Sequence, residues 1–112
     1  MSAPAHPVTA EPCCPHFHNA VELVGKRWTG AILYVLLQSD GPMRFSEIAH
    51  AVPDLSDRLL SERMKELERR GIVRRHVAAT TPVRVEYELT ARGRELDSAL
   101  AELKRWADRW LG

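Results

Sequence analysis

The hydrophobic periodicity of the chain changes at Gly71, and this change constrains the fold more than any other feature. Before Gly71, apolar residues recur at three- and four-residue spacing, which is typical of amphipathic helices. After it, the runs 72–77 and 83–89 are rich in β-branched residues and partly alternate, which predicts two strands joined by a hairpin tip at 78–82. With 112 residues the chain is long enough for one domain, so both patterns must share one core.

The pattern before Gly71 divides into short helices. The expected segments are 17–24, 28–37, 45–52 and 56–70. The fourth has the clearest start, because Ser56 can cap it while Leu55 and Leu60 occupy the positions of a hydrophobic staple. A final helix is expected over 91–111, capped by Thr90. Helices, a hairpin and a last helix in this order predict a mainly helical α+β fold, a winged helix-turn-helix with a two-stranded wing.

The two ends of the chain are expected to differ. Residues 1–12 contain three prolines and show no apolar period, which predicts a flexible tail ahead of a domain over 13–112. The longest apolar run, 31–37, is too short to span a bilayer, and the N-terminus lacks the pattern of a secretory signal. We therefore expect no membrane partner and a cytoplasmic location with reduced thiols.

The net charge of +1 argues, taken alone, against a nucleic-acid partner. Its distribution reverses that inference. Residues 58–84 carry eight basic and three acidic side chains, a net charge of +5, whereas 1–40, 41–57 and 85–112 are each slightly negative. The positive charge therefore falls on the fourth helix and the hairpin, the elements with which a winged helix meets DNA phosphates.

The fourth helix has one apolar and one polar face. At 100° per residue, Leu60, Met64 and Leu67 form the buried side. The opposite side carries Arg58, Glu62, Lys65 and Arg69, with Ser61 and Glu66 beside them. Charged residues opposite an apolar stripe are usually only a solvated face. The turn before this helix and the basic hairpin after it favour DNA contact instead, with the first two turns reading base edges in a major groove.

Several segments, in order and spacing, resemble the HxlR-type winged helix-turn-helix regulators. They are Cys14-Pro15, Val24-Gly25-Lys26-Arg27-Trp28, Arg44-Phe45-Ser46-Glu47-Ile48, Leu55 to Ser61, Leu67 to Val73, and Pro82 to Thr90 followed by Gly93. The resemblance covers nearly everything from Cys14 to Trp110. It implies a DNA-binding transcription factor that works as a homodimer on an inverted-repeat operator, often as a repressor.

The resemblance and the helix pattern together give the expected DNA-binding residues. These are Arg27, Arg44, Ser56, Asp57, Arg58, Ser61, Glu62, Lys65 and Arg84. Arg27 and Arg44 stand next to helix N-termini, where they could bind backbone phosphate. Arg84 could enter the minor groove or instead pair with Glu86 or Glu88. Lys26 is either a phosphate contact or a solvated side chain, and Trp28 is expected to pack in the core.

The final helix carries more apolar surface than a small core can cover. Packing within the chain is one explanation, and pairing with a second subunit through the first and last helices is the other. The family resemblance implies the second. The expected dimer residues are Phe17, Val21, Leu96, Leu100, Leu103, Trp106, Ala107 and Trp110.

Two adjacent cysteines precede the first helix. In part of the family a cysteine just before the proline detects oxidants or electrophiles, and Cys14 matches that position. A place at the helix N-terminus would favour its thiolate form. Cys13 could act as a resolving thiol, and an unreactive role for both remains the alternative. Neighbouring histidines lack zinc-finger spacing, so we expect no metal and no cofactor.

Other function classes fit the sequence less well. The chain has no glycine-rich phosphate loop, nucleophile elbow or paired metal-binding motif, so an enzyme is not expected. A winged helix that binds a protein partner without sequence-specific DNA binding is the remaining alternative. The +5 segment argues against it, because a protein-binding wing does not need such positive charge.

Overall fold

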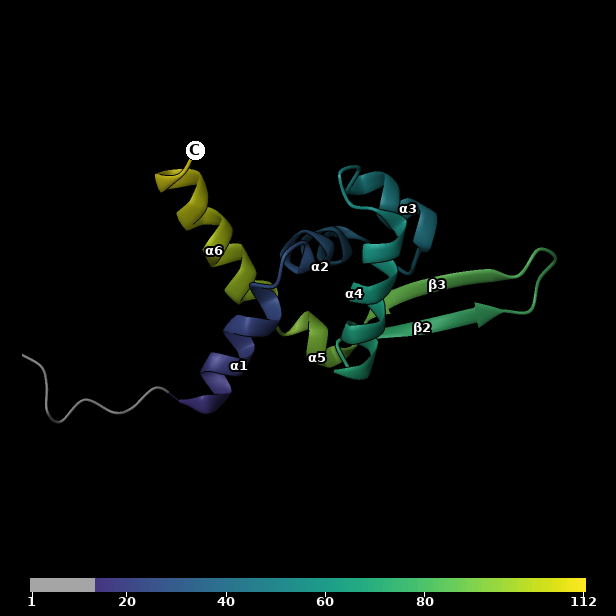
Figure 1. Cartoon of the computed structure of the whole chain (residues 1–112), viewed down its shortest axis with the longest axis horizontal. Helices are drawn as coiled ribbons and strands as arrows, with labels where there is room; N and C mark the ends of the chain where they lie inside the picture. Colours follow the sequence, from purple (N-terminus) through teal and green to yellow (C-terminus); the bar gives the residue numbers. More distant parts are fainter. Residues whose placement is uncertain (1–13) are drawn as a thin grey trace, which may run out of the picture.

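The computed structural model describes residues 14–112, so the expected tail over 1–12 lies outside the described residues (Figure 1). The elements are α1 (Pro15–Val24), α2 (Thr29–Gln38), β1 (Met43–Arg44), α3 (Phe45–Ala51), α4 (Asp57–Arg69), β2 (Val73–Ala78), β3 (Arg84–Leu89), α5 (Ala91–Arg94) and α6 (Asp97–Trp110). The fold is mainly helical with one small antiparallel sheet, as predicted. Helices α3 and α4 form the helix-turn-helix, and the β2–β3 hairpin is the wing.

The core lies among α2, α3, α4 and the sheet. Helix α2 contributes Ile32 and Leu33, both 0% exposed. Helix α4 buries Leu60, Met64 and Leu67, the three residues predicted for its inner face. The sheet adds Val73, Tyr87 and Leu89. Burying these side chains fixes the rotation of α4 about its axis and thereby decides which residues it exposes.

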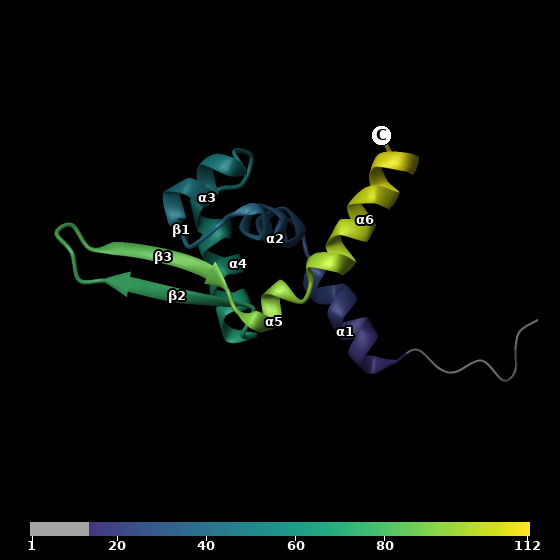
Figure 2. The ribbon, with the colours of Figure 1, turned by 180° about the vertical axis from the view of Figure 1, so that it is seen from behind.

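The sheet contains a third strand that the sequence pattern did not indicate. Strand β1 pairs with β3, so the strand order is β1-β3-β2 (Figure 2). In this antiparallel arrangement Met43 lies opposite Tyr87 and Arg44 opposite Glu86. Two residues are too few to show an alternating pattern, because a period of two cannot be recognised over one repeat. The pairing brings the start of α3 next to the wing.

The prediction of a single helix over 91–111 was wrong, because this segment forms two helices, α5 and α6. Thr90 caps α5 as predicted, since its Oγ1 accepts the Gly93 N–H at 3.2 Å. The same hydroxyl donates to the Gly71 carbonyl at 2.5 Å, which ties α5 to the end of α4. The Leu96 N–H then bonds to the Gly93 carbonyl, three residues back, at 3.1 Å. This tighter turn ends α5 and lets α6 leave in a new direction.

Helices α1 and α6 lie at the edge of the core: neither contains a buried residue, and the partly buried Leu23, Val24 and Leu100 pack against it. Both views show them next to each other, on the side of the molecule away from the hairpin (Figures 1 and 2). No helix among residues 14–112 is long and apolar enough to cross a membrane.

Candidate nucleic-acid interface

The start of the recognition helix α4 is fixed by the two signals found in the sequence. Ser56 Oγ accepts the Leu59 N–H at 3.2 Å, which satisfies one of the unpaired donors at the helix start. Leu55 and Leu60 are 5% and 0% exposed, as the predicted hydrophobic staple requires. Because its hydroxyl caps the helix, Ser56 already has a structural role, and the exposed Asp57 follows it in the first turn.

The outward face of α4 exposes the side chains expected to meet DNA. Arg58, Glu62 and Lys65 are exposed, while Ser61 is partly buried. Arg58 Nε lies 3.5 Å from Glu62 Oε2, one helical turn away. Such exposed pairs contribute about 0–1 kcal/mol, so Arg58 can exchange its partner for a phosphate or a base edge at little cost. Lys65 forms no ion pair with any described residue, which leaves its ammonium available.

One face of the wing is close to charge-balanced. His76 Nε2 lies 2.6 Å from Glu88 Oε1, and Arg74 Nη1 lies 3.9 Å from the same oxygen. Arg84 Nη1 lies 3.9 Å from Glu86 Oε2, so Arg84 has one of the two carboxylate partners that its sequence neighbours suggested. Part of the positive charge counted along the sequence is therefore neutralised within the wing, which reduces its attraction for phosphates.

Arg75 is the functional candidate that sequence reasoning missed. It points to the opposite face of β2 from its neighbour Arg74, since successive side chains alternate across a strand. It therefore shares the face of the buried Val73, and it pairs in register with Tyr87. Its side chain is exposed and forms no ion pair with the described residues. The alternation along the strand was visible in the sequence and could have separated Arg75 from Arg74.

The structure brings Arg44 and Arg84 together. Both line an open hollow of about 430 Å³ between the start of α3 and the tip of the hairpin, which also contains Ser46. The Arg44 N–H donates to Glu47 Oε1 at 2.8 Å, so the backbone of Arg44 is held while its side chain stays exposed. Two cations around one hollow suit the backbone of a nucleic acid.

Arg27 lies elsewhere, on the turn between α1 and α2. Its guanidinium stands over the Trp28 ring, 5.4 Å from the ring centre. Trp28 is partly buried and packs against the core, as expected. The predicted DNA-binding residues thus belong to three neighbouring sets: α4, the hollow beside the wing, and the α1–α2 turn.

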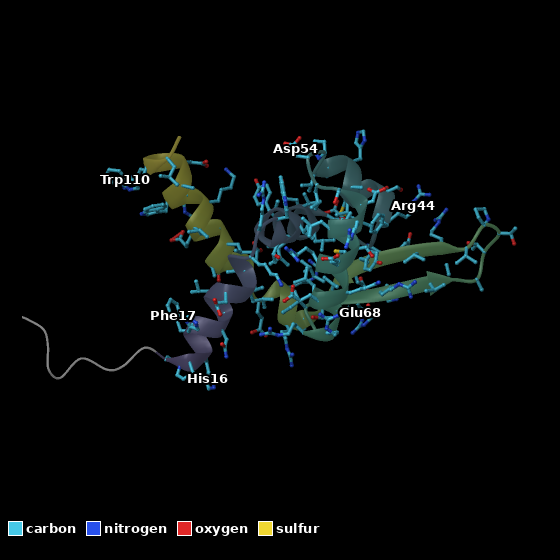
Figure 3. All side chains as sticks on the ribbon, viewed as in Figure 1. His16, Phe17, Arg44, Asp54, Glu68 and Trp110 are labelled. Carbon is cyan, nitrogen blue, oxygen red and sulfur yellow. The ribbon has the colours of Figure 1, made fainter. Side chains whose placement is uncertain are left out.

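The predicted dimer residues divide into two groups. Leu96 and Leu100 pack against the chain's own core, and Ala107 is partly buried. The exposed members are Phe17 at 66%, Val21 at 48%, Leu103 at 56%, Trp106 at 54% and Trp110 at 63%. Figure 3 shows the labelled Phe17 and Trp110 on α1 and α6, at the opposite end of the molecule from the hairpin. The exposed dimer candidates Phe17 and Trp110 therefore lie away from the wing.

Cys14 is the residue immediately before α1, where it occupies the N-cap position with Pro15 next to it. Its side chain is exposed. Cys13 lies outside the described residues. The predicted place of Cys14 at the start of the first helix is confirmed.

A winged helix-turn-helix with exposed basic residues on its recognition helix defines a class of DNA-binding proteins. The family model described as HxlR-like helix-turn-helix matches residues 23–112. The chain belongs to this family, as the sequence motifs indicated, and is a DNA-binding transcriptional regulator.

Three relatives give the extent of the similarity. The chain is 50% identical over 98 residues to the HTH-type transcriptional regulator YvaP of Bacillus subtilis, covering 88% of this chain and 89% of YvaP. The reduced form of the transcriptional regulator YodB from B. subtilis matches with a TM-score of 0.78 and 45% identity, over 88% of this chain and 95% of YodB. The redox regulator HypR in its oxidised form matches with a TM-score of 0.77 and 34% identity, over 86% of this chain and 96% of HypR.

Proposed function

We propose that the protein is a homodimeric repressor that binds an inverted-repeat operator through α4 and the wing. The observation that carries the proposal is the exposed face of α4, where Arg58, Lys65 and Arg69 stand opposite the buried Leu60, Met64 and Leu67. The predicted contacts outside α4 are Arg44 and Arg84 at the hollow beside the wing and Arg27 on the α1–α2 turn. A winged helix that binds only a protein would not need this concentration of cations. The proposal places the protein in the cytoplasm and gives it no catalytic activity.

The exposed apolar residues of α1 and α6 support the homodimer. Phe17, Trp106 and Trp110 are each more than half exposed, and aromatic residues are enriched in the buried centres of protein interfaces. A two-fold axis through these helices would leave both recognition helices free. It would place them about 34–36 Å apart, one turn of DNA, which matches an inverted repeat.

Arg75 and Arg74 form a matched pair for testing the wing contact. Arg75→Ala is expected to lower DNA affinity and to reduce the slope of log affinity against log salt by about 0.9, the value for one lost phosphate contact. Arg74→Ala removes the same charge from the opposite face, where Glu88 already balances it, and is expected to change the slope less. Fluorescence anisotropy at four or more salt concentrations measures both slopes. Equal slopes in the two variants would show that Arg75 does not contact a DNA phosphate.

We also propose that Cys14 makes operator binding sensitive to oxidants or electrophiles. Cys14 is exposed at the start of α1, next to the surface proposed for dimerisation. YodB has been solved in diamide-treated and quinone-bound forms, and HypR is described as a redox regulator. A bridge between adjacent Cys13 and Cys14 would be strained, so a bridge between subunits or a mixed disulfide is the expected oxidised product.

Cys14→Ser is expected to abolish the response to diamide. Diamide accepts two electrons from two thiols as a disulfide forms. Cys14→Ser lacks the thiol that is proposed to supply one of these two sulfurs. Operator affinity is measured by mobility shift before and after treatment, alongside non-reducing electrophoresis to detect a covalent dimer. Cys13→Ser is the second variant: it keeps the response if Cys14 pairs with the same residue of the other subunit, and it loses the response if Cys13 is the resolving thiol. An equal loss of affinity in wild type and Cys14→Ser would clear Cys14 of a sensing role.

A further inference from the structure

Two side chains of the recognition helix reach across to the turn between α1 and α2. Lys26 Nζ, on the turn, donates to Glu66 Oε1 of α4 at 3.1 Å. Arg63 Nε, also on α4, donates to the backbone carbonyl of Arg27 at 3.0 Å. Arg63 and Glu66 are three residues apart and so lie on one flank of the helix. The turn over 25–28 and α4 are thus joined by two polar contacts between segments about forty residues apart in sequence.

The turn itself has a constrained backbone. Trp28 has φ 74° and ψ −17°, in the left-handed region that bulky residues rarely adopt. Such a conformation persists only where the surrounding structure holds it. Here the indole packs against the core and the Arg27 guanidinium covers its ring. The turn is therefore a rigid part of the structure, and the two hydrogen bonds hold α4 in position against it.

Lys26 lies next to the face of α4 proposed to bind DNA. It shares an open hollow of about 260 Å³ with Glu62, Lys65 and Arg69. A lysine at this place could contact a phosphate directly, or it could hold α4 in position through Glu66. The hydrogen bond to Glu66 favours the second role, because this pair is shorter than Arg58–Glu62, 3.1 against 3.5 Å, and its carboxylate side chain is 21% exposed against 54%, so Lys26 exchanges its partner for a phosphate less readily than Arg58 does.

We infer that Lys26, Glu66 and Arg63 are positioning residues that set the orientation of α4 against the α1–α2 turn. Reading base edges requires side chains held within a fraction of an ångström, whereas attraction to phosphates tolerates small shifts. The contacts therefore determine affinity for the operator and leave affinity for unrelated DNA largely unchanged. This inference rests on the proposed DNA-binding function and assigns to that function three residues outside the expected contact set.

Lys26→Met and Glu66→Gln separate positioning from a simple effect of charge. If charge alone mattered, Lys26→Met would weaken DNA binding and Glu66→Gln would strengthen it, since it removes an anion beside the interface. Positioning predicts instead that both variants weaken operator binding, by about two- to fivefold, the range for an exposed ion pair. It also predicts that the double variant binds no more weakly than the single variants, because all three break the same contact.

The measurement is anisotropy titration against an operator selected from a random-sequence pool and against a scrambled duplex. Arg63→Met tests the second contact and is expected to weaken operator binding by about two- to tenfold. Arg94→Ala is the control, because Arg94 is an exposed cation on α5, outside the surfaces proposed for DNA binding and dimerisation. Thermal unfolding of every variant shows that it is folded.

The outcomes are distinct. Weaker operator binding in both single variants, with unchanged binding to scrambled DNA and an unchanged salt slope, supports the inference. Opposite effects of Lys26→Met and Glu66→Gln, or a loss of about one unit of salt slope in Lys26→Met, would overturn it and make Lys26 a phosphate contact. Operator affinities equal to wild type in both variants would overturn it as well. If wild type itself does not distinguish the operator from scrambled DNA, the proposed function fails instead.

Discussion

Replacing Gly93 by alanine is expected to lower the free energy of unfolding by about 1–3 kcal/mol, the usual cost of overpacking a close contact. Gly93 is buried in α5, and an added Cβ would lie 2.3 Å from the Ile72 carbonyl oxygen and 2.9 Å from Leu89 Cδ2. The Ile72 oxygen belongs to the backbone and accepts the Thr90 N–H at 3.0 Å. It cannot move without disturbing the junction of α4, the wing and α5.

Gly41→Ala provides the matched control. A Cβ at Gly41 meets no atom within 4 Å, and the backbone there is not left-handed. This substitution is expected to change stability by no more than about 0.5 kcal/mol. Urea titration followed by circular dichroism measures both variants. If Gly93→Ala were as stable as Gly41→Ala, Gly93 would not pack closely against Ile72 in the protein.

Arg58→Ala and Lys65→Ala are each expected to weaken operator binding by about 5- to 150-fold, which corresponds to 1–3 kcal/mol for a base-reading side chain. Both residues lie on the exposed side of α4, away from the core, so the fold should be retained. Arg58 must leave Glu62, 3.5 Å away, to reach DNA, and the exposure of this pair keeps that cost small. Anisotropy with an operator selected from a random pool gives the affinities.

Arg94→Ala is the control for this pair. Arg94 is an exposed cation on α5, outside the proposed interface, and its removal lowers the total charge equally. We expect its operator affinity to stay within about twofold of wild type, since distant exposed charges are screened by salt. Unchanged affinity in both Arg58→Ala and Lys65→Ala would show that another face of the protein reads the DNA.

Much of the fold could be predicted because strong local signals specify it. The spacing of Leu60, Met64 and Leu67 defined the inner face of α4, and the Ser56 cap with its staple defined the start. The β-branched runs after Gly71 predicted both strands of the wing. The motifs from Cys14 to Gly93 identified the family through their order and spacing together.

Other features depend on contacts between distant segments and could not be read from local patterns. Strand β1 exists because Met43 and Arg44 meet Tyr87 and Glu86, more than forty residues later. The break before α6 lies at the turn in which the Leu96 N–H bonds to the Gly93 carbonyl, where Gly93 packs against Ile72. The helical pattern over 91–111 is continuous in the sequence and contains no sign of this turn.

The candidate site shows the same division. The sequence correctly indicated which side of α4 is exposed, since that follows from helical periodicity. It offered Glu86 and Glu88 as alternative partners of Arg84 without choosing between them. It could not show that Glu88 offsets Arg74, or that Arg63 and Glu66 hold the turn carrying Lys26. The charge of a segment is a sum over residues, whereas the charge available to DNA depends on which side chains already have partners.

The most direct test of the central claim is a mobility-shift titration of wild-type protein on three duplexes: an operator selected from random DNA, one of its half-sites, and a scrambled sequence. We predict an inverted repeat with half-sites about 10–10.5 base pairs apart, bound by two chains and at least about 1,000-fold more tightly than the scrambled duplex. A selection that enriches no sequence, with equal affinity for all three duplexes, would contradict the assignment of this chain as a dimeric, sequence-reading regulator.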